Sequence, residues 1–139
     1  MEKKESCIFC RIARGEIPCY KVYEDNFVIA FLDVNPASRG HTLVVPKEHC
    51  SDFTTCPKDL LDHCFEVAQA IAQAQIAQLG ATGVNVLTNV GASAGQSVLH
   101  FHIHVIPSYR EPILGLKGTN LQIEDKEMLL LQDEIKKAI

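Results

Sequence analysis

Three histidines alternate with apolar residues in the segment His100-Phe-His102-Ile-His104-Val-Ile. Because successive side chains of a strand point to opposite faces, a strand here places all three imidazoles on one face, about 6.6 Å apart. Three kinds of chemistry fit such a row. It can be a polar face that happens to be rich in histidine, a zinc site supplied by His-x-His, or a nucleophile with acid/base partners of tuned pKa.

A glycine-rich loop, Gly91-Ala-Ser-Ala-Gly95-Gln96-Ser97, comes shortly before this segment. Its glycines permit unusual backbone angles, so that amides can turn inward and bind phosphate oxygens. The loop is no P-loop, because no Gly-Lys-Ser/Thr follows, and no dinucleotide fingerprint, because it leads into a strand. A hairpin across the loop brings Gln96 and Ser97 near His102. Phosphate donors beside an imidazole nucleophile predict phosphoryl or nucleotidyl transfer.

Cys7 and Cys10 form a C-x-x-C and offer two thiolates at metal-ligand spacing. Zinc would need two further ligands, which the spacing does not identify, and the pair can equally be incidental. We expect the remaining cysteines, at positions 19, 50, 56 and 64, to be reduced. No carboxylate sits beside the histidine segment, so Ser97 is not expected to belong to a Ser-His-Asp triad.

The elements that position these residues follow from periodicity and turn residues. Helix 57–79 is the clearest, with Pro57 in its first turn and Gly80 as its stop. A last helix, roughly 124–138, has acids at its start and lysines at its end. His63, on the long helix, is expected to be a surface residue, and the sequence identifies no partner for it. The long helix has an apolar stripe of Leu61, Cys64, Phe65, Ala68, Ile71, Ala72 and Leu79.

Strands outnumber helices in this reading and are joined by short turns, which predicts an α+β fold with an antiparallel sheet. A short helix precedes them at 7–14, stopped by Gly15 and Pro18. The predicted strands are 19–24, 26–33, 41–46, 84–89 and 100–106.

Length and composition limit the possible functions. A chain of 139 residues fits one domain, 1–139, with 108–139 as a C-terminal extension ending in a helix. The net charge of −4 disfavours a broad nucleic-acid surface, and the longest apolar run, 27–32, is too short to span a bilayer. The first residues contain no apolar segment of the signal-peptide kind, so we expect a cytoplasmic protein without nucleic-acid or membrane partners.

The segment from Gln96 to Pro107 resembles the signature of the histidine triad family, His-φ-His-φ-His-φ-φ, in which φ is apolar. Further stretches match the family in order, so that the resemblance covers about residues 7–107. It is greatest to the nucleoside phosphoramidate hydrolases, also called histidine triad nucleotide-binding proteins. This implies a five-stranded antiparallel sheet with a long helix and short flanking helices, continued across a homodimer. The matching stretches are 8–17, 31–34, 40–47 and 89–107.

The resemblance implies a hydrolase that binds a purine nucleotide, an AMP or GMP moiety, and cleaves through a covalent nucleotidyl-histidine. His102 matches the nucleophile, His104 and His41 match the histidines that face the phosphate, and Asp33 matches the acid that holds the ribose hydroxyls. The implied contacts to the phosphate and leaving group are Asn89, Gly95, Gln96 and Ser97. The implied apolar slot for the base is Phe9, Ile12, Phe31, Val34 and Leu43.

Some members of the family hold a zinc ion, and the resemblance implies Cys7, Cys10, His49 and His100 as its ligands here. Such a closed set would be structural, with one zinc per protomer. Two other functions stay open: hydrolysis of dinucleoside polyphosphates, and a non-catalytic nucleotide-binding module in regulation. A nucleotide-sugar uridylyltransferase typically has glutamine at the third triad position, so His104 argues against that branch.

Overall fold

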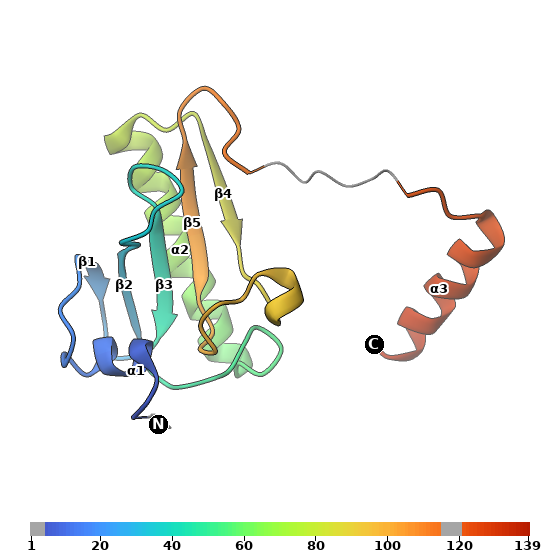
Figure 1. Cartoon of the computed structure of the whole chain (residues 1–139), viewed down its shortest axis with the longest axis horizontal. Helices are drawn as coiled ribbons and strands as arrows, with labels where there is room; N and C mark the ends of the chain where they lie inside the picture. The colour runs from blue at the N-terminus through green and yellow to red at the C-terminus, as the bar shows by residue number, and fades with distance from the viewer. Residues whose placement is uncertain (1–4, 115–120) are drawn as a thin grey trace.

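Five antiparallel strands form one sheet in the order β1-β2-β3-β5-β4 in the computed structural model, which describes residues 5–114 and 121–139 (Figure 1). The predicted α+β fold is confirmed. Most strand boundaries lie within two residues of those expected. The strands are β1 Lys21–Glu24, β2 Val28–Leu32, β3 Thr42–Pro46, β4 Gly83–Leu87 and β5 Ile103–Ser108.

The strand expected at 100–106 begins only at Ile103, and this prediction of its start was wrong. The backbone groups of the three preceding residues bind outside the sheet ladder. The Phe101 amide donates to the Cys50 carbonyl over 2.7 Å, and the His102 carbonyl accepts from Thr88 over 2.7 Å. The histidine segment therefore enters the sheet from a turn that is tied to two other parts of the chain.

The long helix α2, Lys58–Leu79, covers one face of the sheet and ends at Gly80, which has a φ of +75°. Its predicted stripe is partly wrong. Phe65 and Leu79 are 36% and 48% exposed, whereas Val67 and Gln75 are buried. Phe65 packs edge-on against Phe53 instead, with ring centroids 6.3 Å apart.

Each face of the central strands has its own apolar cluster. Beneath α2 lie Val28, Ala30 and the apolar residues that alternate with the triad histidines. On the other face the short helix α1, Ile8–Ala13, supplies Phe9 and Ile12 to a second cluster with Ile29, Phe31, Leu43 and Val45. Because His102 and His104 alternate with Phe101 and Ile103, they lie on the α1 face of the sheet.

The C-terminal helix α3, Asp125–Lys137, stands apart from the sheet in Figure 1 and has no buried residue. A three-residue 3₁₀ turn, η1 Ala92–Ala94, lies in the glycine-rich loop. In the described part of the chain, no helix has the length and apolar character needed to cross a bilayer.

Candidate functional site

His102 is held by its own main chain. Its Nδ1 lies 2.7 Å from the carbonyl oxygen of His100, which can only accept, so Nδ1 carries the proton and Nε2 keeps its lone pair. The ring is 6% exposed and packs edge-on against Phe9 and His104, with centroids 5.1 and 4.9 Å away. Burial lowers the pKa of His102, although the hydrogen bond to the carbonyl opposes this shift. A neutral imidazole with a free Nε2 is the form that can act as a nucleophile.

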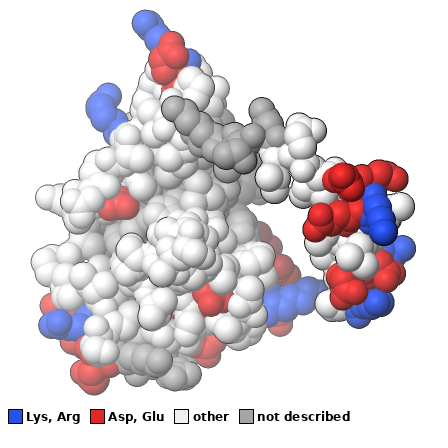
Figure 2. Space-filling model, turned by 45° about the vertical axis from the view of Figure 1, so that its right-hand side comes forward, with Lys and Arg blue, Asp and Glu red and all other residues white. Residues whose placement is uncertain are grey.

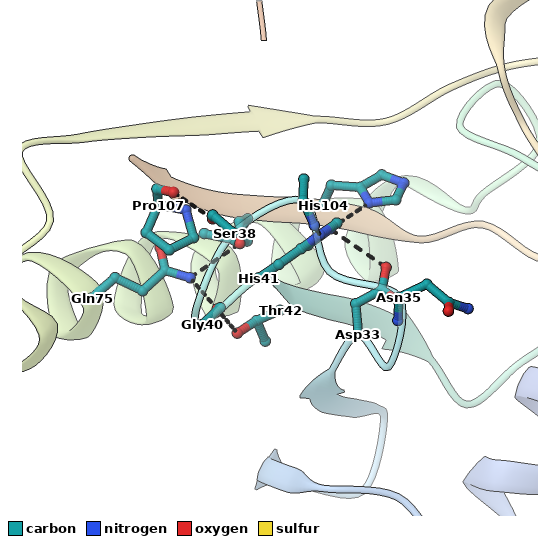
Figure 3. Close-up of polar contacts among 11 residues, drawn as sticks. Asp33, Asn35, Ser38, Gly40, His41, Thr42, Gln75, His104 and Pro107 are labelled. Atoms are coloured by element: carbon teal, nitrogen blue, oxygen red, sulfur yellow. Dashed lines mark hydrogen bonds and ion pairs between the residues drawn. The ribbon is translucent and has the colours of Figure 1, made fainter. Parts of the chain in front are cut away.

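His41 and His104 form a directed pair beside it (Figure 3). The amide of Ala37 donates to His41 Nδ1 over 3.0 Å, so the proton of His41 sits on Nε2 and is donated to His104 Nδ1, 2.9 Å away. The remaining proton of His104 then lies on its Nε2. Burial, followed by repulsion from His102 and His41, lowers the pKa of His104 to about 4. Burial also lowers the pKa of His41.

The Asp33 carboxylate lies at the edge of this pair, with Oδ2 3.6 Å from His41 Nε2. Its other oxygen, Oδ1, accepts the Asn35 amide over 2.8 Å and so fixes the turn that follows β2. Since both histidines are neutral near pH 7, Asp33 gains little from them. Its Oδ2 is the oxygen that faces the site, as Figure 3 shows.

The loop that carries His41 is anchored by two residues that the sequence analysis did not single out. Gln75 of α2 donates through Nε2 to the carbonyls of Gly40 and Val105, each over 3.0 Å, and Ser38 donates to the Pro107 carbonyl (Figure 3). Gly40 has a φ of +95°, and a Cβ there would lie 2.6 Å from Leu79 Cδ1. This position therefore needs glycine, and α2 is linked directly to the residue before His41.

The glycine-rich loop folds on itself around Gln96. The buried Gln96 side chain accepts the Gly91 amide over 2.9 Å and donates to the carbonyls of Ser51 and Val98. Its amide also donates to the Gly91 carbonyl, so Gln96 shapes the loop. Gly95, at a φ of +96°, lies against Asn89, since a Cβ there would come 3.6 Å from Asn89 Nδ2.

Ser97, in contrast with Gln96, is exposed on the same loop. Strands β4 and β5 pair antiparallel on either side of it, which confirms the hairpin expected from the sequence.

Four of the five residues expected in the base slot lie together. Phe9, Ile12, Phe31 and Leu43 belong to the apolar cluster beneath α1, and the Phe9 ring touches both Phe31 and His102. Val34 is outside this cluster and 73% exposed. The structure thus places a largely buried apolar cluster against the His102 ring, through Phe9.

The four expected zinc ligands converge at one end of α1. Their donor atoms all lie within 4.8 Å of one another. His100 Nδ1 is 3.3 Å from Cys7 Sγ and 3.6 Å from Cys10 Sγ, and His49 Nδ1 is 3.3 Å from Cys10 Sγ. Tetrahedral zinc with ordinary Zn–S and Zn–N bonds separates such donors by about 3.6 Å, so the cluster fits this ion.

The same cluster orients its own ligands. His100 is fully buried, and its Nε2 donates to the Pro46 carbonyl over 2.8 Å, which leaves Nδ1 for the metal. None of the six cysteines forms a disulfide, in agreement with the expectation. His100 therefore joins the two centres, because its ring faces the thiols while its carbonyl holds His102.

His63 is half-buried and has a partner that the sequence analysis could not identify. Its Nε2 lies 2.6 Å from Oδ2 of Asp25, which also accepts from Tyr23 over 2.7 Å. Burial opposes the charge on Asp25, but hydrogen bonds from Tyr23, Phe27, His63 and Val28 outweigh it and hold the pKa of Asp25 below its ordinary range. This contact ties α2 to the β1–β2 turn.

Comparison with protein families matches the HIT domain over residues 14–111. An uncharacterized HIT-like protein of Borreliella burgdorferi is 41% identical over 133 residues, which cover 91% of this chain and 94% of that protein. The adenylylsulfatase HINT3 of Arabidopsis thaliana is 40% identical over 104 residues, which cover 75% of this chain but 53% of that protein.

Solved structures agree with these matches. A crystal structure of a HIT family protein from Bacillus subtilis is 37% identical and superposes with a TM-score of 0.90, covering 97% of this chain and 98% of that one. A histidine triad nucleotide-binding protein from Sulfolobus tokodaii is 35% identical, with a TM-score of 0.73 and coverage of 94% and 90%. A zinc-bound histidine triad protein from Mycobacterium smegmatis is 36% identical, with a TM-score of 0.72 and coverage of 96% and 98%.

Proposed function

Since this chain belongs to the HIT family, we propose that it is a nucleotidyl hydrolase that cleaves purine nucleoside phosphoramidates or related nucleotidyl substrates. One observation carries the proposal. The His100 carbonyl fixes the proton of His102 on Nδ1, which leaves Nε2 free, and the His104 ring, which carries its proton on Nε2, packs against the His102 ring with centroids 4.9 Å apart. A nucleophile next to a hydrogen-bond donor is the arrangement that phosphorus chemistry requires.

In the first half-reaction the Nε2 lone pair of His102 attacks the α-phosphorus. A P–Nε2 bond forms, the P–N bond to the leaving amine breaks, and the amine departs with a proton. We propose that the Ser97 hydroxyl gives this proton to the amine nitrogen and regains one from solvent, because it lies on the exposed rim of the glycine-rich loop. His104 donates its Nε2 proton to a phosphate oxygen, where negative charge develops. His41 acts through His104 by donating to its Nδ1.

In the second half-reaction water attacks the phosphorus of the nucleotidyl-histidine and loses one proton to solvent, the electron pair of the P–Nε2 bond returns to Nε2, and the mononucleotide leaves. His102 returns to its neutral form, because Nδ1 kept its proton on the His100 carbonyl throughout. The low pKa of His104 keeps its ring a neutral donor near pH 7. Asn89 and Gly95 complete the phosphate contacts in this proposal, with Gln96 holding their loop in shape.

We propose that the nucleoside lies across the α1 face. The Asp33 carboxylate faces the site and can accept from the 2′ and 3′ hydroxyls. The base then lies on the apolar surface of Phe9, Ile12, Phe31 and Leu43. This surface is poor in polar groups, so adenine and guanine should be bound with similar affinity.

We further propose one structural zinc per protomer, held by Cys7, Cys10, His49 and His100. The donor distances support it. When bound, the ion would supply a closed four-ligand link between α1 and the start of β5, with no position for substrate. His100 contributes to catalysis through its carbonyl, which orients His102.

A homodimer is the assembly we propose. Strand β4 is an edge strand of the sheet, and its Val86 is 45% exposed. Edge strands of this kind pair readily with another copy, which would extend the sheet across the dimer.

The test is incubation with adenosine 5′-phosphoramidate, followed by intact-protein mass spectrometry. The native chain should show one added adenylyl group at early times and release AMP. His102→Ala should show neither adduct nor turnover, while His63→Ala, a histidine outside the site, should keep both. Retention of more than a tenth of native turnover by His102→Ala would overturn the proposal.

A substrate panel separates the alternatives. It should contain adenosine and guanosine phosphoramidates, adenosine phosphosulfate and diadenosine tetraphosphate. Adenosine phosphosulfate is included because one relative is named an adenylylsulfatase. Preference for the tetraphosphate would favour a polyphosphate hydrolase, and binding of AMP without any turnover would favour a regulatory module.

A further inference from the structure

The apolar face of α3 lies uncovered outside the sheet domain. Met128, Leu131 and Ile135 lie three and four positions apart and form one stripe on the helix, with exposed fractions of 41–61%. An isolated helix of 13 residues is marginal in water, so its stability requires a surface to pack on. Figure 2 shows charged side chains of both signs crowded on this arm, while the neighbouring face of the body is almost uncharged.

A matching surface exists beside α2. A groove of about 770 Å³ runs between α2 and strands β1 and β2. It follows α2 from His63 to Leu79, which at 1.5 Å per residue is about 24 Å, so it is long enough for the 13 residues of α3, which span about 20 Å. Its walls are largely apolar and include Val22, Leu32, Ala70, Ile71, Ala74 and Leu79.

Charges at the two ends of the groove complement those of α3. Arg39 lies at the Leu79 end, since its neighbour Gly40 contacts Leu79, and Glu66 lies at the other. Helix α3 has acids in its first turn and Lys136 and Lys137 in its last. An α3 laid antiparallel to α2 therefore sets its acidic start near the arginine and its basic end near the glutamate.

We propose that α3 of one protomer docks antiparallel to α2 in the groove of a second copy of this chain, and that the exchange is reciprocal. The inference rests on the proposed homodimer. Helix α3 projects past β4, which is one edge of the sheet and the edge proposed to face the second copy (Figure 1). The groove of the same chain is bordered by β1, which is the opposite edge. Two such contacts would bury on the order of 2,000 Å², which is the range of stable dimers.

Hydrogen–deuterium exchange of the full-length chain at micromolar concentration tests the docking. Amides of α3 should exchange at least about tenfold more slowly than in a free peptide of the same sequence. Leu131→Glu in the stripe and Ala74→Glu in the groove should each abolish this protection. Ala77→Glu, on an exposed α2 residue that does not line the groove, should leave it intact.

Mixing the two variants distinguishes exchange between copies from folding back within one chain. A heterodimer of Leu131→Glu and Ala74→Glu has one intact stripe facing one intact groove, so protection should return for the α3 of the Ala74→Glu chain. Protection that stays absent in the mixture, or that does not weaken on dilution of the native chain, would overturn the inference. Sedimentation velocity distinguishes failure of the proposed homodimer from failure of the α3 docking. A monomer refutes the homodimer, whereas a dimer in which α3 is unprotected refutes only the docking of α3 in the second copy.

Discussion

Replacing Thr88 with valine tests how firmly the nucleophile is held. Thr88 Oγ1 donates to the His102 carbonyl over 2.7 Å; His102 is buried and Thr88 is half-buried. Valine fills nearly the same volume but removes the donor, so the carbonyl loses this partner. Such a loss costs about 1–2 kcal/mol of unfolding free energy, because a protected acceptor is left less well satisfied. For a chain of this size the midpoint of thermal unfolding should fall by roughly 3–8 °C.

Thr82→Val is the matched control. At the other end of the same hairpin, Thr82 Oγ1 donates to the Ser108 carbonyl over a longer 3.3 Å and accepts the Arg110 amide over 3.0 Å, both in exposed positions. Their loss should change the free energy of unfolding by about 0.5 kcal/mol or less. Urea unfolding followed by circular dichroism measures both variants. Protein and zinc concentrations must be fixed, since dimerisation and metal binding add to apparent stability by mass action.

The same pair tests catalysis. The orientation of His102 Nε2 matters for attack on phosphorus and little for binding, so Thr88→Val should lower kcat by about three- to tenfold with a smaller change in KM. Thr82→Val should leave both constants near the native values. The reasoning is refuted if Thr88→Val unfolds at the native urea concentration, or if Thr82→Val loses as much stability as Thr88→Val.

Three further predictions concern the zinc content, the stability at acid pH and the recognition of the ribose. The purified chain should contain about one zinc ion per protomer by elemental analysis. Cys10→Ser should lose the zinc and unfold at a lower temperature, while Cys19→Ser should keep both the zinc and the native unfolding temperature. A native chain that is free of zinc and as stable as the zinc-loaded chain would contradict this. Because His104 has a pKa of about 4 when folded and a higher one when unfolded, the unfolded chain binds more protons below pH 6.5. Neutral His104, which faces His41, His102 and Asp33, should therefore contribute stability that is full above pH 6.5 and falls by up to about 3 kcal/mol towards pH 4. In His104→Gln, the urea midpoint should depend less on pH between pH 4 and 6.5. An unchanged slope in this range would refute the assignment. Native chain should bind AMP about ten- to a hundredfold more tightly than 2′-deoxy-AMP by calorimetry, and Asp33→Ala should abolish the difference; equal native affinities would exclude Asp33 as the ribose acceptor.

Local sequence patterns predicted much of the fold because the relevant signals are short in range. The alternation of histidine with apolar residues predicted that His102 and His104 lie on the face opposite Phe101 and Ile103, and Gly80 ends α2 at the residue where helical periodicity stops. The start of β5 was predicted wrongly, because the backbone groups of Phe101 and His102 bind to Cys50 and Thr88, which lie outside this segment. No periodicity encodes such contacts.

The residues that sequence reasoning missed are polar residues on apolar elements. Gln75 occupies a buried position of α2 because it can serve two carbonyls of neighbouring segments at once. His63 pairs with Asp25, 38 positions away, only because the β1–β2 turn meets the start of α2. In a sequence, Gln75 and His63 look like solvent-facing residues of a helix.

The three triad histidines share one sequence pattern, yet their protonation is set by three different hydrogen-bond partners, two acceptors and one donor. His100 donates through Nε2 to Pro46, His102 donates through Nδ1 to the His100 carbonyl, and His104 receives at Nδ1 from His41. These partners leave Nδ1 of His100 as a ligand, Nε2 of His102 as a nucleophile and Nε2 of His104 as a donor. The regular spacing therefore supplies three equivalent rings, and the surrounding backbone, by fixing one tautomer on each, makes them chemically different.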